Sequence, residues 1–215
     1  MPREYGAHPI ALPVKPTASL RKATIVLFWC TVGASVLVAF AALNRRSVWE
    51  GFRDGTKSFA DLDDADGLIA GAAAVEVLVA LAAVIVLSIW TLRTARNATA
   101  VGATNVSPGL ACGGWYIPFG NLVVPFIQLR RVATHRGQPT EMVSLWQGLF
   151  IATFVASGLF RSMGNLELAE DADDLGSRLT NQTILAFAMA VLLAVMTVVA
   201  TRAMRQLDGD AVAST

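Results

Sequence analysis

Glu76 is the residue whose type and position most directly indicate chemistry. It is the only acidic or basic residue well inside residues 68–90, an apolar stretch long enough to cross a membrane. A carboxylate in hydrocarbon is costly, so it usually marks an ion or proton pathway and has a cationic partner. Arg161, Arg45 and Arg46 are the partners that the sequence offers. We favour the alternative interpretation, a protonated or ion-paired carboxyl that only orders helix packing.

A second candidate site lies in an uncharged stretch, residues 110–129, which contains three glycines and two prolines. Glycine and proline interrupt helices, so a straight spanning helix is not expected there. The amide groups at the start of a half-helix attract anions, and broken helices form binding sites in transporters. A turn that only caps itself is the simpler interpretation. The candidate residues are Gly114, Trp115, Pro118, Asn121 and Pro125.

The other polar residues form no recognisable reactive group. The acidic run 61–67 has Ala65 and Ala72 where a calcium loop needs ligands. The two cysteines and two histidines lack the spacing of metal ligands. We therefore predict no metal site, no cofactor and no catalytic residues. A net charge of +1 gives no basis for nucleic-acid binding.

Four proline-free apolar segments must position these candidates, and each is long enough to cross a membrane. About 20 apolar residues span the hydrocarbon core. Only 15% of the chain is charged, whereas soluble domains have about 25%. The sequence therefore predicts an all-α integral membrane four-helix bundle. Its predicted spans are residues 23–43, 68–90, 142–160 and 183–203.

The polar segments outside these spans are predicted to be tails and loops. Residues 1–22 contain four prolines and are expected to form a flexible cytoplasmic tail, with a second tail at residues 204–215. Residues 44–67 and 161–182 are expected to form the outer loops. A cleavable signal peptide competes for the first span, but the apolar run is longer than a usual signal sequence.

The distribution of Lys and Arg predicts the orientation. With four spans and an inside N-terminus, eleven of these residues lie inside and six outside. If residues 110–129 formed a fifth span, the ratio would be eight to nine. We therefore predict a multi-pass protein of the cell (plasma) membrane with both termini cytoplasmic. The inside set is Arg3, Lys15, Arg21, Lys22, Arg93, Arg96, Arg130, Arg131, Arg136, Arg202 and Arg205.

Residues 107–136 are predicted to form an interrupted helical hairpin between the second and third spans. Ser107 and Pro108 favour a helix start, and Asn121 is expected to cap a second helix. The hairpin can dip into the membrane from the cytoplasmic side or lie in the interface, and we favour the interfacial form. Anionic lipid headgroups attract basic residues near the cytoplasmic surface. The candidate headgroup contacts are Arg93, Arg96, Arg130 and Arg131.

This part of the chain resembles a known family. The residues that carry the resemblance are Trp90-x-x-Arg93-x-x-Arg96-Asn97, Ser107-Pro108-Gly109, Gly114-Trp115-Tyr116-Ile117-Pro118 and Asn121-Leu122 followed by Pro125-Phe126. They resemble the signature of the bacterial membrane family known as domain of unknown function 4328, over about residues 70–203. Val124 departs from it, because a basic residue is expected before the proline. The resemblance implies a multi-span, actinobacterial membrane protein and brings no activity and no catalytic residues.

These observations favour a non-enzymatic function. We expect an accessory or scaffold component of a membrane complex, whose partners are the lipid bilayer and other membrane proteins. The alternative is a small transporter or a proton or ion pathway that uses Glu76 and the turn at residues 114–121.

Overall fold

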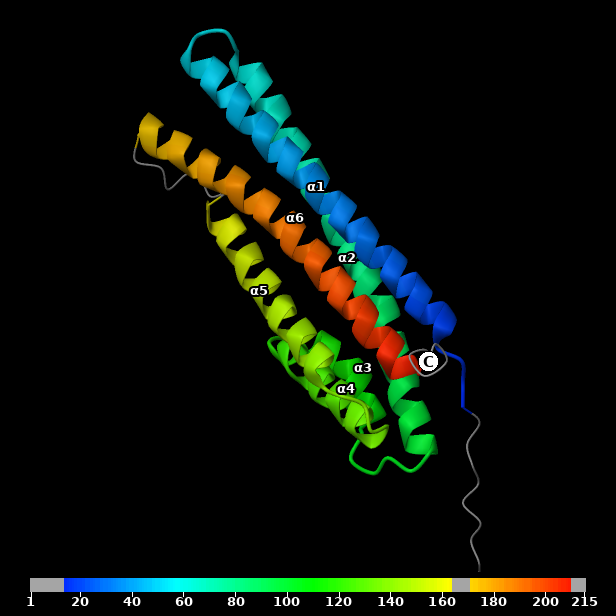
Figure 1. Ribbon diagram of the computed structural model, residues 1–215. Coiled ribbons are helices and arrows are strands. Elements are labelled where there is room, and N and C mark those ends of the chain that lie inside the picture. The colour runs from blue at the N-terminus through cyan, green and yellow to red at the C-terminus, as the bar shows by residue number, and fades with distance from the viewer. Residues whose placement is uncertain (1–13, 164–170, 210–215) are drawn as a thin grey trace, which may run out of the picture.

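The computed structural model describes residues 14–163 and 171–209, and the regular structure within these ranges is entirely helical (Figure 1). The helices are α1 (Ala18–Arg53), α2 (Phe59–Ala100), α3 (Pro108–Gly113), α4 (Val124–His135), α5 (Glu141–Met163) and α6 (Ala172–Asp208), with 3-10 turns η1 (Gly114–Tyr116) and η2 (Gly120–Leu122). Of these, α1, α2, α5 and α6 are long and apolar enough to cross a membrane. The predicted all-α, four-span fold class is therefore confirmed.

Three of the spanning helices are much longer than their apolar runs. They contain 36 residues in α1, 42 in α2 and 37 in α6, whereas about 20 cross the hydrocarbon. Residues 44–53, 59–67, 161–163 and 172–182 of the predicted outer loops are helical, and their position outside the membrane stays a prediction. A polar sequence keeps a segment out of hydrocarbon, but it does not end a helix.

Local capping explains where two of these long helices begin. The Ser58 hydroxyl accepts a hydrogen bond from the Asp61 amide, and the Asp61 carboxylate accepts one from the Ser58 amide at 2.8 Å, which forms a capping box at the start of α2. The Asp171 carboxylate accepts from the amides of Asp173 and Asp174 at the start of α6. Both helices therefore begin at side-chain caps outside the apolar segments.

The predicted flexibility of the N-terminal tail is wrong for residues 18–22, which are helical. Helix α1 begins at Ala18, inside the predicted N-terminal tail, and α6 continues to Asp208, inside the C-terminal one. The two ends are joined, because the Arg21 guanidinium and the Thr17 hydroxyl donate to Asp208 at 3.1 and 2.8 Å. Residues 1–13 and 210–215 of the predicted tails lie outside the described residues.

The four long helices do not form a closed ring. Helix α1 lies against α2 and α6, and α6 lies against α5, whereas α2 and α5 make little direct contact. The α1–α6 contact is close because alanines meet there, namely Ala39, Ala42 and Ala186. At the end of the bundle where α1 begins and α6 ends, α3 and α4 lie between α2 and α5 (Figure 1).

Candidate functional site

The segment between α2 and α5 is divided into two short helices by two 3-10 turns. Ser107 caps α3 by accepting from the Leu110 amide at 3.4 Å, and Pro108 occupies the first turn, as predicted. The predicted capping role of Asn121 is wrong. Helix α4 begins at Val124 without a side-chain cap, because Asn121 is taken up in the preceding turn η2.

The two arms of this segment approach each other closely and return to the same end of the bundle. A Cβ atom at Gly114 would lie 2.9 Å from the Val124 side chain and 3.1 Å from that of Pro125, so only glycine permits this approach. Arg131, 26 positions after Asn105, donates to the Asn105 carbonyl at 2.9 Å. The depth of this segment relative to a bilayer stays a prediction.

Hydrogen bonds attach the turn to α2. The Trp115 indole N–H donates to the Thr91 hydroxyl at 3.2 Å, and that hydroxyl lies 2.8 Å from the Ala111 carbonyl oxygen. The Ser88 and Tyr116 hydroxyls are also hydrogen-bonded, at 2.8 Å. Since buried polar groups need partners, α2 supplies polar positions that hold this irregular backbone in place.

Aromatic rings fill the space between the turn and α5. Phe126 of α4 is fully buried, and its ring centroid lies 5.4 Å from that of Trp115, 5.3 Å from that of Trp146 and 5.7 Å from that of Phe150. We call these four residues the aromatic cluster. Of these rings, the sequence pointed to Trp115 as a site residue and to Phe126 as part of the Pro125-Phe126 motif, whereas Trp146 and Phe150 of α5 belong to no motif.

A cavity of about 310 Å³ lies beside the aromatic cluster, between α2 and α5 and with α1 and α6 behind it. We call it the lateral cleft. Most of its wall is apolar, but it includes Thr31, Thr153, Ser157 and Thr197. The hydroxyls of the first three donate to carbonyl groups of their own helices. The remaining lining residues are Phe28, Ala73, Glu76, Val77, Ala80, Ala83, Val84, Phe150, Phe160, Arg161, Met189, Leu193 and Met196.

Glu76 and Arg161, which the sequence analysis suggested as partners, line this same cleft. Arg161 acts electrostatically on the half-buried Glu76 carboxyl, and Ser35 is its other polar neighbour. The two do not form one of the ion pairs found among residues 14–163 and 171–209. Arg45, an alternative partner, instead pairs with Asp66. The cleft thus holds a carboxylate and a guanidinium that are near each other without being bonded.

The turn at residues 114–121 does not line the lateral cleft. The cleft ends at Phe150, whose ring packs edge-on against Trp115 at a centroid distance of 5.7 Å. Gly114, Trp115 and Pro125 are buried, whereas Pro118 is exposed. The two candidate sites are therefore distinct, and the Phe150 ring contacts both of them.

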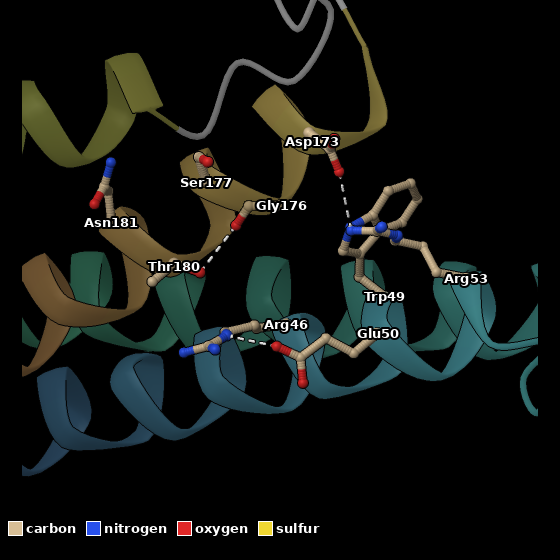
Figure 2. A pocket seen from close by; sticks show the side chains of 9 residues that line it. All are labelled: Arg46, Trp49, Glu50, Arg53, Asp173, Gly176, Ser177, Thr180 and Asn181. Atoms are coloured by element: carbon tan, nitrogen blue, oxygen red, sulfur yellow. Dashed lines mark hydrogen bonds and ion pairs between the residues drawn. The ribbon is translucent and has the colours of Figure 1, made fainter.

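A second cavity, of about 500 Å³, lies between the polar extensions of α1 and α6 (Figure 2). It brings together side chains of opposite charge. Arg46 pairs with Glu50 at 2.9 Å, and Arg53 pairs with Asp173 at 3.3 Å (Figure 2). We call it the outer pocket. Because each guanidinium has a carboxylate beside it, its charges are balanced internally.

The four candidate headgroup contacts separate into two groups. Arg130 donates to the Gln147 amide oxygen and Arg131 to a backbone carbonyl, so both hold the 107–136 segment in place. Arg93 and Arg96 instead line a cavity of about 550 Å³ together with Lys15, which the sequence analysis did not single out. We call it the inner pocket. Its other lining residues are Ile89, Leu92, Asn97, Thr99 and Ala100.

Comparison with known proteins tests the resemblance noted in the sequence. No curated protein and no solved structure matches the chain. One family model does match, over residues 53–209, which includes α2 to α6 and the turn. By this match the chain belongs to the family described as Domain of unknown function (DUF4328).

Proposed function

We propose that this protein is a non-enzymatic component of a membrane complex and that a transmembrane helix of a partner protein packs over its lateral cleft. The proposal rests on the unequal burial of the four spanning helices by the rest of the protein. In the most apolar window of each helix, 17% of the residues are buried in α2 and 11% in α5, against 39% in α1 and 50% in α6. The two helices that flank the cleft are thus the least covered ones.

The chemistry of the cleft supports a protein partner over a lipid chain. Ala73, Ala80 and Ala83 lie on the α2 side, and small residues allow helices to approach closely in a membrane. A lipid chain could cover this apolar wall, but it offers nothing to the Glu76 carboxyl or the Arg161 guanidinium. Glu76 is half-buried and Arg161 is exposed, and charged groups within a membrane are stabilised by polar partners, which a side chain of a second helix can supply.

Site-specific photo-crosslinking tests this function. A photoreactive residue at Ala80, in the cleft wall, is expected to give a discrete protein adduct in the cells that naturally make this protein. The control position is Val26, which is exposed on α1 and does not line the cleft. Adducts to lipid alone at Ala80, or the same protein adduct from both positions, would contradict the proposal.

A small proton or ion pathway is the second candidate function. It is favoured by the placement of a carboxylate, a guanidinium and four hydroxyl groups in one cavity between spanning helices. The Phe150 ring lies between this cavity and Trp115 of the turn, so a pathway that used both would require this ring to move. The crosslinking result discriminates between the two functions, because a pathway needs no partner helix in the cleft.

The proposal also assigns both termini to the cytoplasm, in a plasma membrane. It is supported by the eleven-to-six excess of Lys and Arg on the inside and by the return of Arg131 to the carbonyl of Asn105. This contact is expected if both ends of the 107–136 segment lie on the same side of the membrane.

Cysteine labelling of intact cells tests this orientation. In a chain with Cys30 and Cys112 replaced by alanine, Thr56→Cys is expected to react with a membrane-impermeant maleimide. Thr104→Cys and Thr140→Cys flank the turn segment and are expected to react only after the cells are opened. If one of these two reacted in intact cells and the other did not, residues 110–129 would cross the membrane.

A further inference from the structure

We propose that the inner pocket binds the phosphate-bearing headgroup of an anionic lipid through Lys15, Arg93 and Arg96. This site is separate from the lateral cleft, so it does not depend on the proposed partner helix. Arg93 and Arg96 are three positions apart on α2 and therefore lie on one face of the helix. The third cation comes from a different part of the chain.

Lys15 is held beside α2 by two hydrogen bonds between its backbone and the side chain of Asn97. Its amide donates to the Asn97 side-chain oxygen at 3.0 Å, and the Asn97 side-chain amide donates to its carbonyl at 2.7 Å. Asn97 is itself buried, with 8% of its surface exposed. These bonds fix the backbone of Lys15 beside Arg93 and Arg96 before any ligand arrives, which lowers the entropic cost of binding.

The charges of the inner pocket are not balanced by the residues that the structure describes. Among these residues, its lining contains three basic side chains and no acidic one. None of the three takes part in an ion pair within the described ranges, 14–163 and 171–209. The outer pocket differs in this respect, because each of its arginines has a carboxylate partner. Gathering like charges is unfavourable, so a bound anion would relieve their repulsion.

The shape of the pocket favours a lipid over a free anion. Ile89 and Leu92 line it on the side of the apolar segment of α2, and Ile89 is 38% exposed. A phosphate ion would leave this apolar wall uncovered, whereas a phospholipid places its phosphate at the cations and its acyl chains along the wall. Guanidinium groups bind phosphate with two parallel hydrogen bonds, so the arginines suit this headgroup. The volume of about 550 Å³ exceeds what one phosphate needs.

The positive-inside rule explains why basic residues lie at this end of the bundle. It does not explain why Lys15, which is 78 positions before Arg93, is fixed beside it by a buried asparagine. The positive-inside rule concerns only how many Lys and Arg residues lie on one side of the membrane, and it does not require any of them to be fixed in one position. Three cations around an apolar-walled cavity are the geometry of a site.

Native mass spectrometry of the detergent-purified full chain tests the site, with palmitoyl-oleoyl phosphatidylglycerol as the probe and phosphatidylcholine as the neutral comparison. The wild type is expected to retain phosphatidylglycerol in preference to phosphatidylcholine. Each basic residue near an anionic lipid contributes about a fivefold gain in affinity. The triple variant Lys15→Gln, Arg93→Gln, Arg96→Gln is therefore expected to have an affinity for phosphatidylglycerol about a hundredfold lower than that of the wild type. Asn97→Ala should give a smaller loss, because it only releases Lys15.

The matched control neutralises three exposed basic residues at the same end, by Lys22→Gln, Arg202→Gln and Arg205→Gln. This control is expected to retain phosphatidylglycerol like the wild type. The thermal unfolding of both triple variants without lipid shows whether they are folded, and retention is compared only between folded variants. An equal loss in both triple variants would overturn the proposal, because charge number alone would then account for binding. Full displacement of the lipid by inorganic phosphate at equal concentration would also overturn it, since a bare anion would then be the ligand.

Discussion

Phe126→Ala is expected to lower the free energy of unfolding by about 3–5 kcal/mol, the usual cost of removing a fully buried phenylalanine. The Phe126 ring is completely buried and contacts the rings of Trp115, Trp146 and Phe150. Its loss would leave a cavity at the point where α4 meets the turn and α5. Unfolding in mixed micelles, followed by tryptophan fluorescence, measures the effect and also reports on Trp115 and Trp146.

The control for this variant is Phe154→Ala, on the outward side of α5. Phe154 is 47% exposed, so its removal is expected to cost less than about 1 kcal/mol. If both variants lost the same amount of stability, the aromatic cluster would not be the main contact between the turn and the bundle. The proposed separation of the lateral cleft from the turn would then lose its physical basis.

The second large effect is expected at the ion pair between Arg21 and Asp208. Their side chains are only 9% and 6% exposed, and they lie 3.1 Å apart. Removing one partner of a buried ion pair takes this interaction away from the other charge and costs about 3–5 kcal/mol. Asp208→Asn is therefore expected to destabilise the protein strongly, with the same unfolding assay as the measurement.

Asp208 has further contacts at this end of the bundle. The Thr17 hydroxyl donates a hydrogen bond to the Asp208 carboxylate, and this carboxylate interacts electrostatically with Arg136. Burial lowers the pKa of Arg136, whereas Asp208 raises it. The Asp208 carboxylate therefore joins the start of α1 to the end of α6, and Arg136 is attached to the same end of α6 because it donates to the Leu207 carbonyl.

A charge swap serves as the control for this prediction. Arg21→Asp with Asp208→Arg restores an ion pair with reversed direction, so the double variant is expected to be more stable than either single one. The coupling energy from this double-mutant cycle isolates the pair from its surroundings. Additive losses in the double variant would show that the two side chains do not interact, and the proposed link between α1 and α6 would be lost.

The local features of the chain could be predicted from its sequence with some success. The four spans follow from the length of the apolar runs, because hydrocarbon thickness sets a minimum that only a few segments meet. The start of α3 follows from Ser107 and Pro108, whose capping preferences depend on adjacent residues only. The position of Gly114 beside Val124 does not follow in this way, since it depends on how two arms approach each other.

Helix ends show where local reasoning fails. The change from apolar to polar residues near position 44 marks the edge of the apolar run, but α1 continues to Arg53. The prediction of Asn121 as a cap fails because the turn η2 takes up that residue before α4 begins. Capping depends on which backbone amides are left without a partner, and the local fold decides that.

The apolar runs of the sequence by themselves determine that the chain has four membrane-length helices, and its glycines and prolines determine where the segment between the second and third is broken. Only the tertiary structure decides that Phe126, Trp146 and Phe150 meet around Trp115. It alone decides that Lys15 joins Arg93 at the inner pocket. The physical reason is that length and hydrophobicity act within one segment, whereas a cavity or a cluster depends on how separate helices pack.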